Sequence, residues 1–177
     1  ALRLDHRGRA ALWLMRARAG YRVRVNATEL LQRIHQGEDS TLECKSAQTK
    51  LKAEDIGRAL CAFANTFGGL LVLGVEDDGR VSGIGDRKQA DELQRQISQV
   101  AQGTTPSIPT NQQVLELESQ RVLVVRVRPQ MAGRPFLHEG RCFVRDGNRT
   151  RPATHSEMGR LFVSAGDSYF DEEVIED

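Results

Sequence analysis

The stretch from residue 53 to residue 79 constrains the fold more than any other part of the sequence. Residues 53–66 (AEDIGRALCAFANT) carry apolar side chains at helical spacing, with two acidic residues in the first turn. Gly68 and Gly69 end this helix, and the next six residues (LLVLGV) lead into the turn sequence EDDG. A continuously apolar run of this length between turn signals predicts a fully buried strand. We therefore expect a helix followed by the central strand of a sheet.

The flanking segments predict further helices and hairpins around this centre. Helices are expected at residues 29–34 and 86–102, and after Thr154 or Ser156, either of which can cap a last short helix with Glu157 near its third position. A strand at 41–47 places Leu42 and Cys44 on one face and Glu43 and Lys45 on the other. Alternating runs predict hairpins that turn around Ser119–Gln120 and at Glu139–Gly140. The pattern indicates an α+β fold with a mixed, mostly antiparallel sheet flanked by helices.

Charge divides the chain into a basic end, a middle and an acidic end. The net charge is +1, yet residues 1–24 hold seven arginines and one acid, and residues 167–177 hold six acids and no basic residue. We expect a helical basic arm at 1–25, a domain at 26–165 and an acidic tail at 166–177. A basic arm can contact phosphate, although runs of like charge are most often solvated segments.

Composition and cysteine spacing exclude several classes of protein. The longest apolar run, Leu70–Leu73 with Gly74 and Val75, is far shorter than the roughly 20 residues of a membrane-spanning helix. The apolar residues 10–15 are followed at once by Arg16, without a small-residue cleavage site, so we expect a cytoplasmic protein. The three cysteines do not cluster at zinc-ligand spacing, which predicts buried thiols and no zinc.

Three motifs carry a resemblance to a known family. The first is Glu38–Lys45 (EDSTLECK), the second is Ala62–Gly69 (AFANTFGG) continued through GVEDDG, and the third is Cys142–Thr150 (CFVRDGNRT). Together, from about residue 28 to residue 163, they resemble the Schlafen AlbA-type domain family (AlbA_2), whose members are regarded as DNA-binding. The departures are Cys44, where the family usually has Phe, and Asp39, where Ser is usual.

The resemblance implies a possible acidic site. Glu38, Glu43 and Asp77 correspond to the acidic triad with which Schlafen endoribonucleases hold divalent metal at the scissile phosphate. Carboxylates suit Mg²⁺ or Mn²⁺, which would be the catalytic cofactor of a nuclease acting on structured RNA such as tRNA. Glu76–Asp78 can equally form an ordinary polar turn, and Glu38 and Glu43 recur in members regarded only as binding modules. The choice of Asp77 over its acidic neighbours depends on the alignment.

Basic residues around the first and last motifs are candidate phosphate contacts. They are Lys45, Lys50, Lys52, Arg134, Arg141, Arg145, Arg149 and Arg151. For any one of them, a solvated surface position is an equally good interpretation. The chain has no GxxxxGK[ST] phosphate loop and no recognisable hydrolase triad.

Three hypotheses follow. The first is a module of a prokaryotic regulator or defence protein that binds DNA or RNA and needs no cofactor. The second is the metal-dependent endoribonuclease, and the third is a dimerising interaction scaffold. Schlafen cores pair two such domains, so the resemblance also implies a homodimer.

Overall fold

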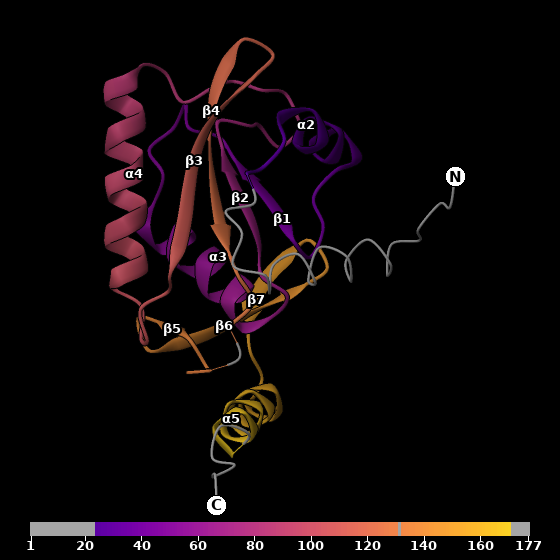
Figure 1. Ribbon diagram of the computed structural model, residues 1–177, viewed down its shortest axis with the longest axis vertical. Helices are drawn as coiled ribbons and strands as arrows, with labels where there is room; N and C mark the ends of the chain where they lie inside the picture. The colour runs from indigo at the N-terminus through magenta and orange to yellow at the C-terminus, as the bar shows by residue number, and fades with distance from the viewer. Residues whose placement is uncertain (1–23, 131, 171–177) are drawn as a thin grey trace, which may run out of the picture.

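The computed structural model describes residues 24–130 and 132–170, with side chains up to residue 165 (Figure 1). The predicted helix of the basic arm and most of the acidic tail lie outside these residues. None of the described helices is long and apolar enough to span a bilayer.

The main sheet has four strands in the order β1 (Leu42–Lys45), β2 (Gly69–Leu73), β4 (Gln120–Val127) and β3 (Thr110–Leu117). β1 runs parallel to β2, whereas β2 with β4 and β4 with β3 are antiparallel. All five residues of β2 are buried in the interior of the sheet. The expected central strand and the α+β class are confirmed.

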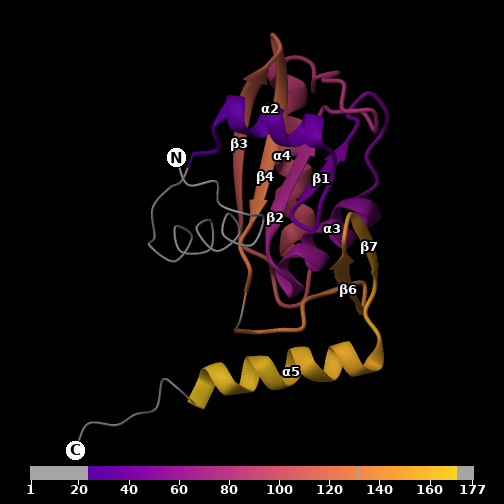
Figure 2. The same ribbon diagram turned by 90° about the vertical axis from the view of Figure 1, so that its right-hand side faces the viewer.

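Helices cover both faces of this sheet. α3 (Ala53–Asn65) and α4 (Arg87–Gln102) lie on one face and α2 (Ala27–Gln36) lies on the other (Figure 2). Because successive strand residues point to opposite faces, Leu71 and Leu73 pack toward α3 and α4, whereas Leu70 and Val72 pack toward α2. The continuously apolar run is thus explained by a strand that is covered on both sides.

The glycine pair after α3 is required by packing. Gly68 has a φ of +70°, and a Cβ there would lie 2.7 Å from the Val127 carbonyl oxygen. A Cβ on Gly69 would lie 2.4 Å from the ring of Phe63. The chain therefore reverses tightly from α3 into β2, and this holds the helix against its own strand.

A second, smaller sheet packs at one end of α3. It consists of β5 (Leu137–His138), β6 (Arg141–Asp146) and β7 (Arg149–Pro152) in that order. The turn at Glu139–Gly140 is confirmed, with both residues at positive φ. The strand β7 was not predicted from the sequence, because Arg149–Pro152 (RTRP) lacks the apolar alternation of a strand.

Two other predictions need correction in their boundaries. The turn between β3 and β4 is formed by Glu118 and Ser119, one residue earlier than expected, and both residues have positive φ. The last helix, α5 (His155–Phe170), has 16 residues and is not short. Its capping box is confirmed with Thr154 as the cap, because the Glu157 N–H donates to Thr154 Oγ1 and the Thr154 N–H donates to Glu157 Oε2.

Candidate functional site

Glu43, on β1, lies at the junction between the two sheets. The structure buries this carboxylate, although strand alternation predicted a charged surface there: Glu43 is only 8% exposed. Its Oε2 is 2.5 Å from Arg145 Nη1 and also accepts a hydrogen bond from Thr150 Oγ1, while its Oε1 is 2.9 Å from Lys45 Nζ. Both oxygens are therefore engaged by groups from within the domain.

Arg145, on β6, is the cation of this junction, and its side chain is completely buried. Besides Glu43, its guanidinium donates to Thr150 Oγ1 and to the backbone oxygen of Asp39, at 2.9 and 2.8 Å. The guanidinium carbon lies 5.1 Å from the centre of the Phe63 ring. Of the N–H groups of this guanidinium, only Nε–H has no partner among the described residues. A buried ion pair is tolerated when its remaining polar groups are hydrogen-bonded, and this one ties the small sheet to β1.

The other two predicted carboxylates, Glu38 and Asp77, belong to the segment before β1 and to the turn after β2. Glu38 Oε1 accepts a hydrogen bond from the backbone N–H of Cys44 at 2.6 Å. This N–H of the edge strand β1 therefore has a partner. Asp77 is exposed in the turn after β2. Burial first, and then the charges of Glu38, Glu43 and Asp77, raise the pKa of Cys44 to about 12. All three carboxylates thus lie within electrostatic range of one thiol.

Proximity to Cys44 does not make these carboxylates a metal centre. The described residues contain no group of three or more His, Cys, Asp or Glu side chains that could hold a metal ion. Glu43 would have to release Arg145 or Lys45 to become a ligand. Metal binding by Glu38, Glu43 and Asp77 therefore stays a prediction, and the observed arrangement does not support it.

The three cysteines are all buried and unpaired, as expected. Burial is the main cause that raises the pKa of each thiol, to about 12 for Cys44 and Cys61 and to about 11 for Cys142. Thiols with such pKa values are protonated at neutral pH and are poor nucleophiles. The structure thus supports a packing role for them.

Four of the eight predicted phosphate contacts are held by other groups of the domain. Besides Arg145 and Lys45, Arg134 donates to the backbone oxygens of Ala64 and Thr66, at 3.2 and 2.8 Å, and burial lowers its pKa. Arg151 donates to Asp146 and Glu157. Arg134, Arg145 and Arg151 each join two elements, whereas Lys45 pairs with Glu43 within β1.

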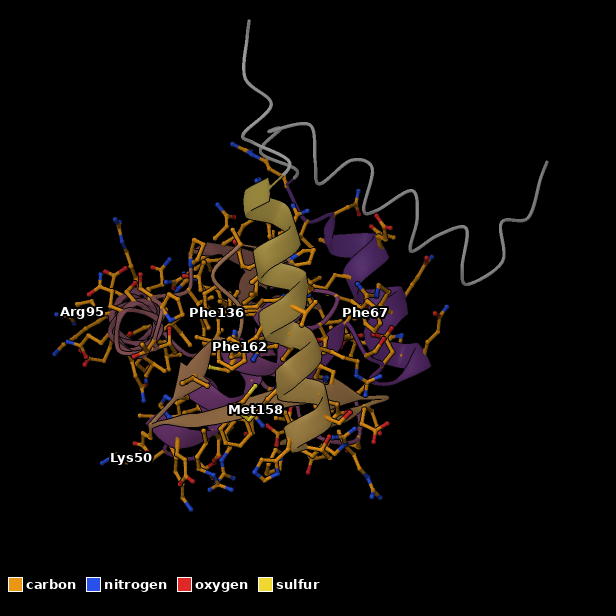
Figure 3. The ribbon with its side chains drawn as sticks, turned by 90° about the horizontal axis from the view of Figure 1, so that it is seen from below. Lys50, Phe67, Arg95, Phe136, Met158 and Phe162 are labelled. Carbon is orange, nitrogen blue, oxygen red and sulfur yellow. The ribbon has the colours of Figure 1, made fainter. Side chains whose placement is uncertain are left out.

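The remaining four, Lys50, Lys52, Arg141 and Arg149, are exposed and make no ion pair with any described residue. Lys50 and Lys52 lie on the segment that enters α3, and Figure 3 shows Lys50 extending away from the body of the molecule. The Arg141 guanidinium lies 5.4 Å from the centre of the Phe143 ring. The guanidinium of Arg58, on the first part of α3, lies 5.6 Å from the same ring. The start of α3 and the strand β6 thus bring cations together at one end of the molecule.

Asn65, the last residue of α3, ties this helix to the backbone around β5 and β6. Its Nδ2 donates to the backbone oxygens of Phe136 and Phe143, and its Oδ1 accepts the Phe136 N–H at 2.8 Å. The contribution of Thr150 to the buried junction was not foreseen. Its position in the third motif was the only available signal.

A comparison with family models matches residues 38–154 to the family described as Schlafen, AlbA_2. The matched segment begins at Glu38 and contains the whole buried junction and all of the exposed cations named above. The chain belongs to the Schlafen AlbA_2 family. In this AlbA_2 domain, the motif at Ala62–Gly69 forms the tight turn from α3 into β2. The motif at Cys142–Thr150 supplies Arg145 and Thr150, which contact Glu43.

This AlbA_2 domain resembles several solved structures, and two of them illustrate the similarity. One is the N-terminal domain of a Nitrosomonas europaea protein described as related to the ATP-dependent DNA helicase RecG. It has 27% identity and a TM-score of 0.52, and the match covers 66% of this chain and 82% of that domain. The other is the DIP2311 protein of Corynebacterium diphtheriae, with 21% identity and a TM-score of 0.50 over 69% of this chain. This match spans only 23% of DIP2311 and shows the fold alone. A comparison with curated proteins finds no match.

Proposed function

We propose that this AlbA_2 domain binds nucleic acid without reading its sequence, through a cationic surface formed by Lys50, Lys52, Arg141 and Arg149. One observation carries the proposal. These four side chains are exposed and make no ion pair with any described residue, whereas the other four candidate cations are already engaged inside the domain. Exposed cations without an ion-pair partner are available to phosphate.

The chemistry of this surface suits a phosphate backbone. Each phosphate that a lysine or arginine neutralises releases condensed counterions, which favours binding at low salt. The stacking of Arg141 on Phe143 orients a guanidinium that can donate two hydrogen bonds to one phosphate. Among the described residues, the large exposed aromatic side chains are Phe67 and Phe162. Phe67 lies between α3 and β2 and Phe162 lies on α5, so neither belongs to the segments that carry the four cations. Contacts to the backbone therefore fit the surface better than stacking on bases.

The comparisons support the same class of ligand. Family membership agrees with a DNA-binding or related domain, and the Nitrosomonas europaea domain comes from a protein related to a DNA helicase. We therefore choose duplex DNA as the first ligand to test, with structured RNA as the second.

The test is incubation of the purified chain with a labelled DNA duplex and with labelled tRNA, each with Mn²⁺ and with a chelator. We expect both nucleic acids to be shifted and to stay intact in every lane. A chain that shifts neither one contradicts the proposal.

The nuclease alternative is tested in the same lanes. Glu43→Ala is a poor variant for this purpose, because it leaves Arg145 buried without its counter-ion. Asp77→Asn is better, because Asp77 is exposed and its loss should leave the fold intact. Metal-dependent fragments of tRNA that disappear in Asp77→Asn would establish the endoribonuclease. The homodimer also stays a prediction, to be checked by light scattering.

A further inference from the structure

The two outer strands of the main sheet, β1 and β3, differ in how their free edges are covered. β1 has only four residues. On its outer edge the N–H of Cys44 donates to Glu38 Oε1, and the backbone oxygen of Leu42 accepts a hydrogen bond of 3.4 Å from Arg145 Nη2. A short edge strand whose polar groups have partners is protected from pairing with another chain.

The outer edge of β3 has no such cover. β3 has eight residues and pairs with β4 along its whole length, without a bulge. Because Glu118 and Ser119 form a two-residue turn, the flanking pair, Leu117 and Gln120, exchanges both backbone hydrogen bonds, and bonded residues then alternate along the strand. The N–H and C=O groups that point away from β4 therefore belong to Thr110, Gln112, Val114 and Glu116. No backbone group of the described residues pairs with them.

The described elements around β3 cover its faces and leave this edge accessible. On one face the side chain of Gln112 reaches α4, where its Nε2 donates to the Gln94 backbone oxygen and to Ser98 Oγ. On the other face the side chain of Gln113 accepts a hydrogen bond from the Val25 N–H. A groove of about 1150 Å³ between α4 and the first part of β3 leaves space beside the strand. A further strand can thus approach the edge without displacing α4.

The sequence of β3 also lacks the residues that usually protect an edge strand. Thr110–Leu117 (TNQQVLEL) contains no proline and no lysine, and Glu116 is its only charged residue. Val114, in the middle of the strand, is an apolar side chain that is 38% exposed. A long, regular and nearly uncharged edge of this kind is suited to the addition of a strand.

A second copy of the chain presents the same open edge and therefore the matching set of donors and acceptors. Two antiparallel β3 strands related by a two-fold axis satisfy both edges at once and leave neither open to a third chain. In the register that places Val114 opposite its own copy, Glu116 lies opposite Gln112. This register brings the two exposed apolar side chains together and keeps the two Glu116 carboxylates apart, whereas like charges directly opposite each other are destabilising.

We propose that two copies of this chain pair through their β3 strands, antiparallel and about a two-fold axis at Val114, so that the two main sheets become one continuous sheet. Val114 of one copy bonds with Val114 of the other, and on either side Gln112 of one copy bonds with Glu116 of the other. Each of these pairs exchanges two backbone hydrogen bonds. The inference does not rest on nucleic-acid binding.

The mass of the full chain in solution, measured by sedimentation equilibrium over a range of concentrations, is the first test. The unmodified chain should have the mass of two copies at high concentration. Val114→Lys places two ammonium groups opposite each other on the axis, on side chains that begin about 5 Å apart, so this variant should have the mass of one copy at the same concentration. The control is Val163→Lys, the same substitution at an exposed apolar position of α5, which should stay dimeric. A monomeric unmodified chain, or a dimer that persists in Val114→Lys or is lost in Val163→Lys, overturns the proposal.

Hydrogen exchange, followed residue by residue by NMR, tests the strand pairing independently of the mass. The N–H groups of Gln112 and Glu116 should exchange about tenfold or more slowly in the dimer than in Val114→Lys. The N–H groups of Gln113 and Leu115 point to β4, so they should stay protected in both and show that Val114→Lys leaves the strand folded. Fast exchange of Gln112 and Glu116 in the dimer overturns the proposal. Protection that persists in monomeric Val114→Lys overturns it as well, because another segment of the same chain would then cover the edge.

Discussion

The junction between the two sheets and the groove between α4 and β3 contain the same kinds of charged and amide side chains, but the two regions differ in how far these side chains are buried. At the junction, Glu43, Arg145 and Asn65 are buried, and most of their polar atoms have partners within the domain. In the groove between α4 and β3, the side chains of Arg87, Lys88 and Arg95 are exposed and Gln112 is half-buried. The difference indicates that burial, and not charge, decides whether a polar residue holds the fold or is available to a ligand.

The strongest test of this difference is Arg145→Ala. The substitution leaves the Glu43 carboxylate buried with Lys45 and Thr150 as its remaining partners, and breaking a buried pair in this way costs about 3–5 kcal/mol. The free energy of unfolding, measured in urea, should fall by that amount. Arg149→Ala is the control, because exposed charges usually change stability by less than about 0.5 kcal/mol. If the two variants unfold alike, the junction does not stabilise the fold.

The amide side chains of Asn65 and Gln112 should also differ in how much each one stabilises the fold. Asn65→Ala removes three hydrogen bonds to the backbone of Phe136 and Phe143 and a longer one to Cys142 Sγ, so we expect a loss of about 2–3 kcal/mol. Gln112→Ala removes two bonds from a partly exposed side chain and should cost about 1 kcal/mol or less. Equal losses in urea denaturation would show that the groove is as structural as the junction.

Packing of the small sheet on α3 gives a third comparison. A Cβ on Gly57 would lie 2.4 Å from the ring of His138, whereas a Cβ on Gly159 in α5 would meet no atom within 4 Å. Gly57→Ala should therefore destabilise the domain by about 1–3 kcal/mol through overpacking. Gly159→Ala should leave stability equal or raise it by up to about 1 kcal/mol, because alanine favours helices. Thermal unfolding of both variants checks the sign, and a stabilised Gly57→Ala would contradict the observed packing.

Much of the fold could be predicted from the sequence because its signals are local. Helical spacing before Gly68, an apolar run after Gly69, and a Thr154–Glu157 capping box each lie within a short window. The buried junction could not be predicted in this way. Arg145 and Glu43 are 102 residues apart, and nothing in either local sequence distinguishes a buried cation from one exposed to solvent, such as Arg149. The eight candidate cations were therefore identified by residue type, and only the structure divides them.

Acid should loosen the start of α5. Hydrogen bonds from Arg151 first, and then from the Thr154 N–H, lower the pKa of Glu157 to about 2 from 4.5. Because the folded pKa is the lower one, the stabilisation from Glu157 is present above pH 4.5 and is lost as the pH falls toward 2. The amide chemical shift of Thr154 should follow this titration. In Glu157→Gln the same shift should stay flat over this range, and a titration that persists there would assign it to another group.

The salt dependence of DNA binding tests the central claim, that Lys50, Lys52, Arg141 and Arg149 bind phosphate, whereas the engaged cations hold the fold. The affinity of the full chain for a labelled duplex is measured over a range of salt concentrations, in the chelator. One variant combines Lys50→Gln, Lys52→Gln, Arg141→Gln and Arg149→Gln. The control variant combines Arg87→Gln, Lys88→Gln and Arg95→Gln, which remove three cations of α4. The account predicts that the slope of log K against log salt becomes shallower by up to about 3.6 in the first variant, at about 0.9 for each lost phosphate contact, and stays unchanged in the control. An unchanged slope in the first variant would contradict the account.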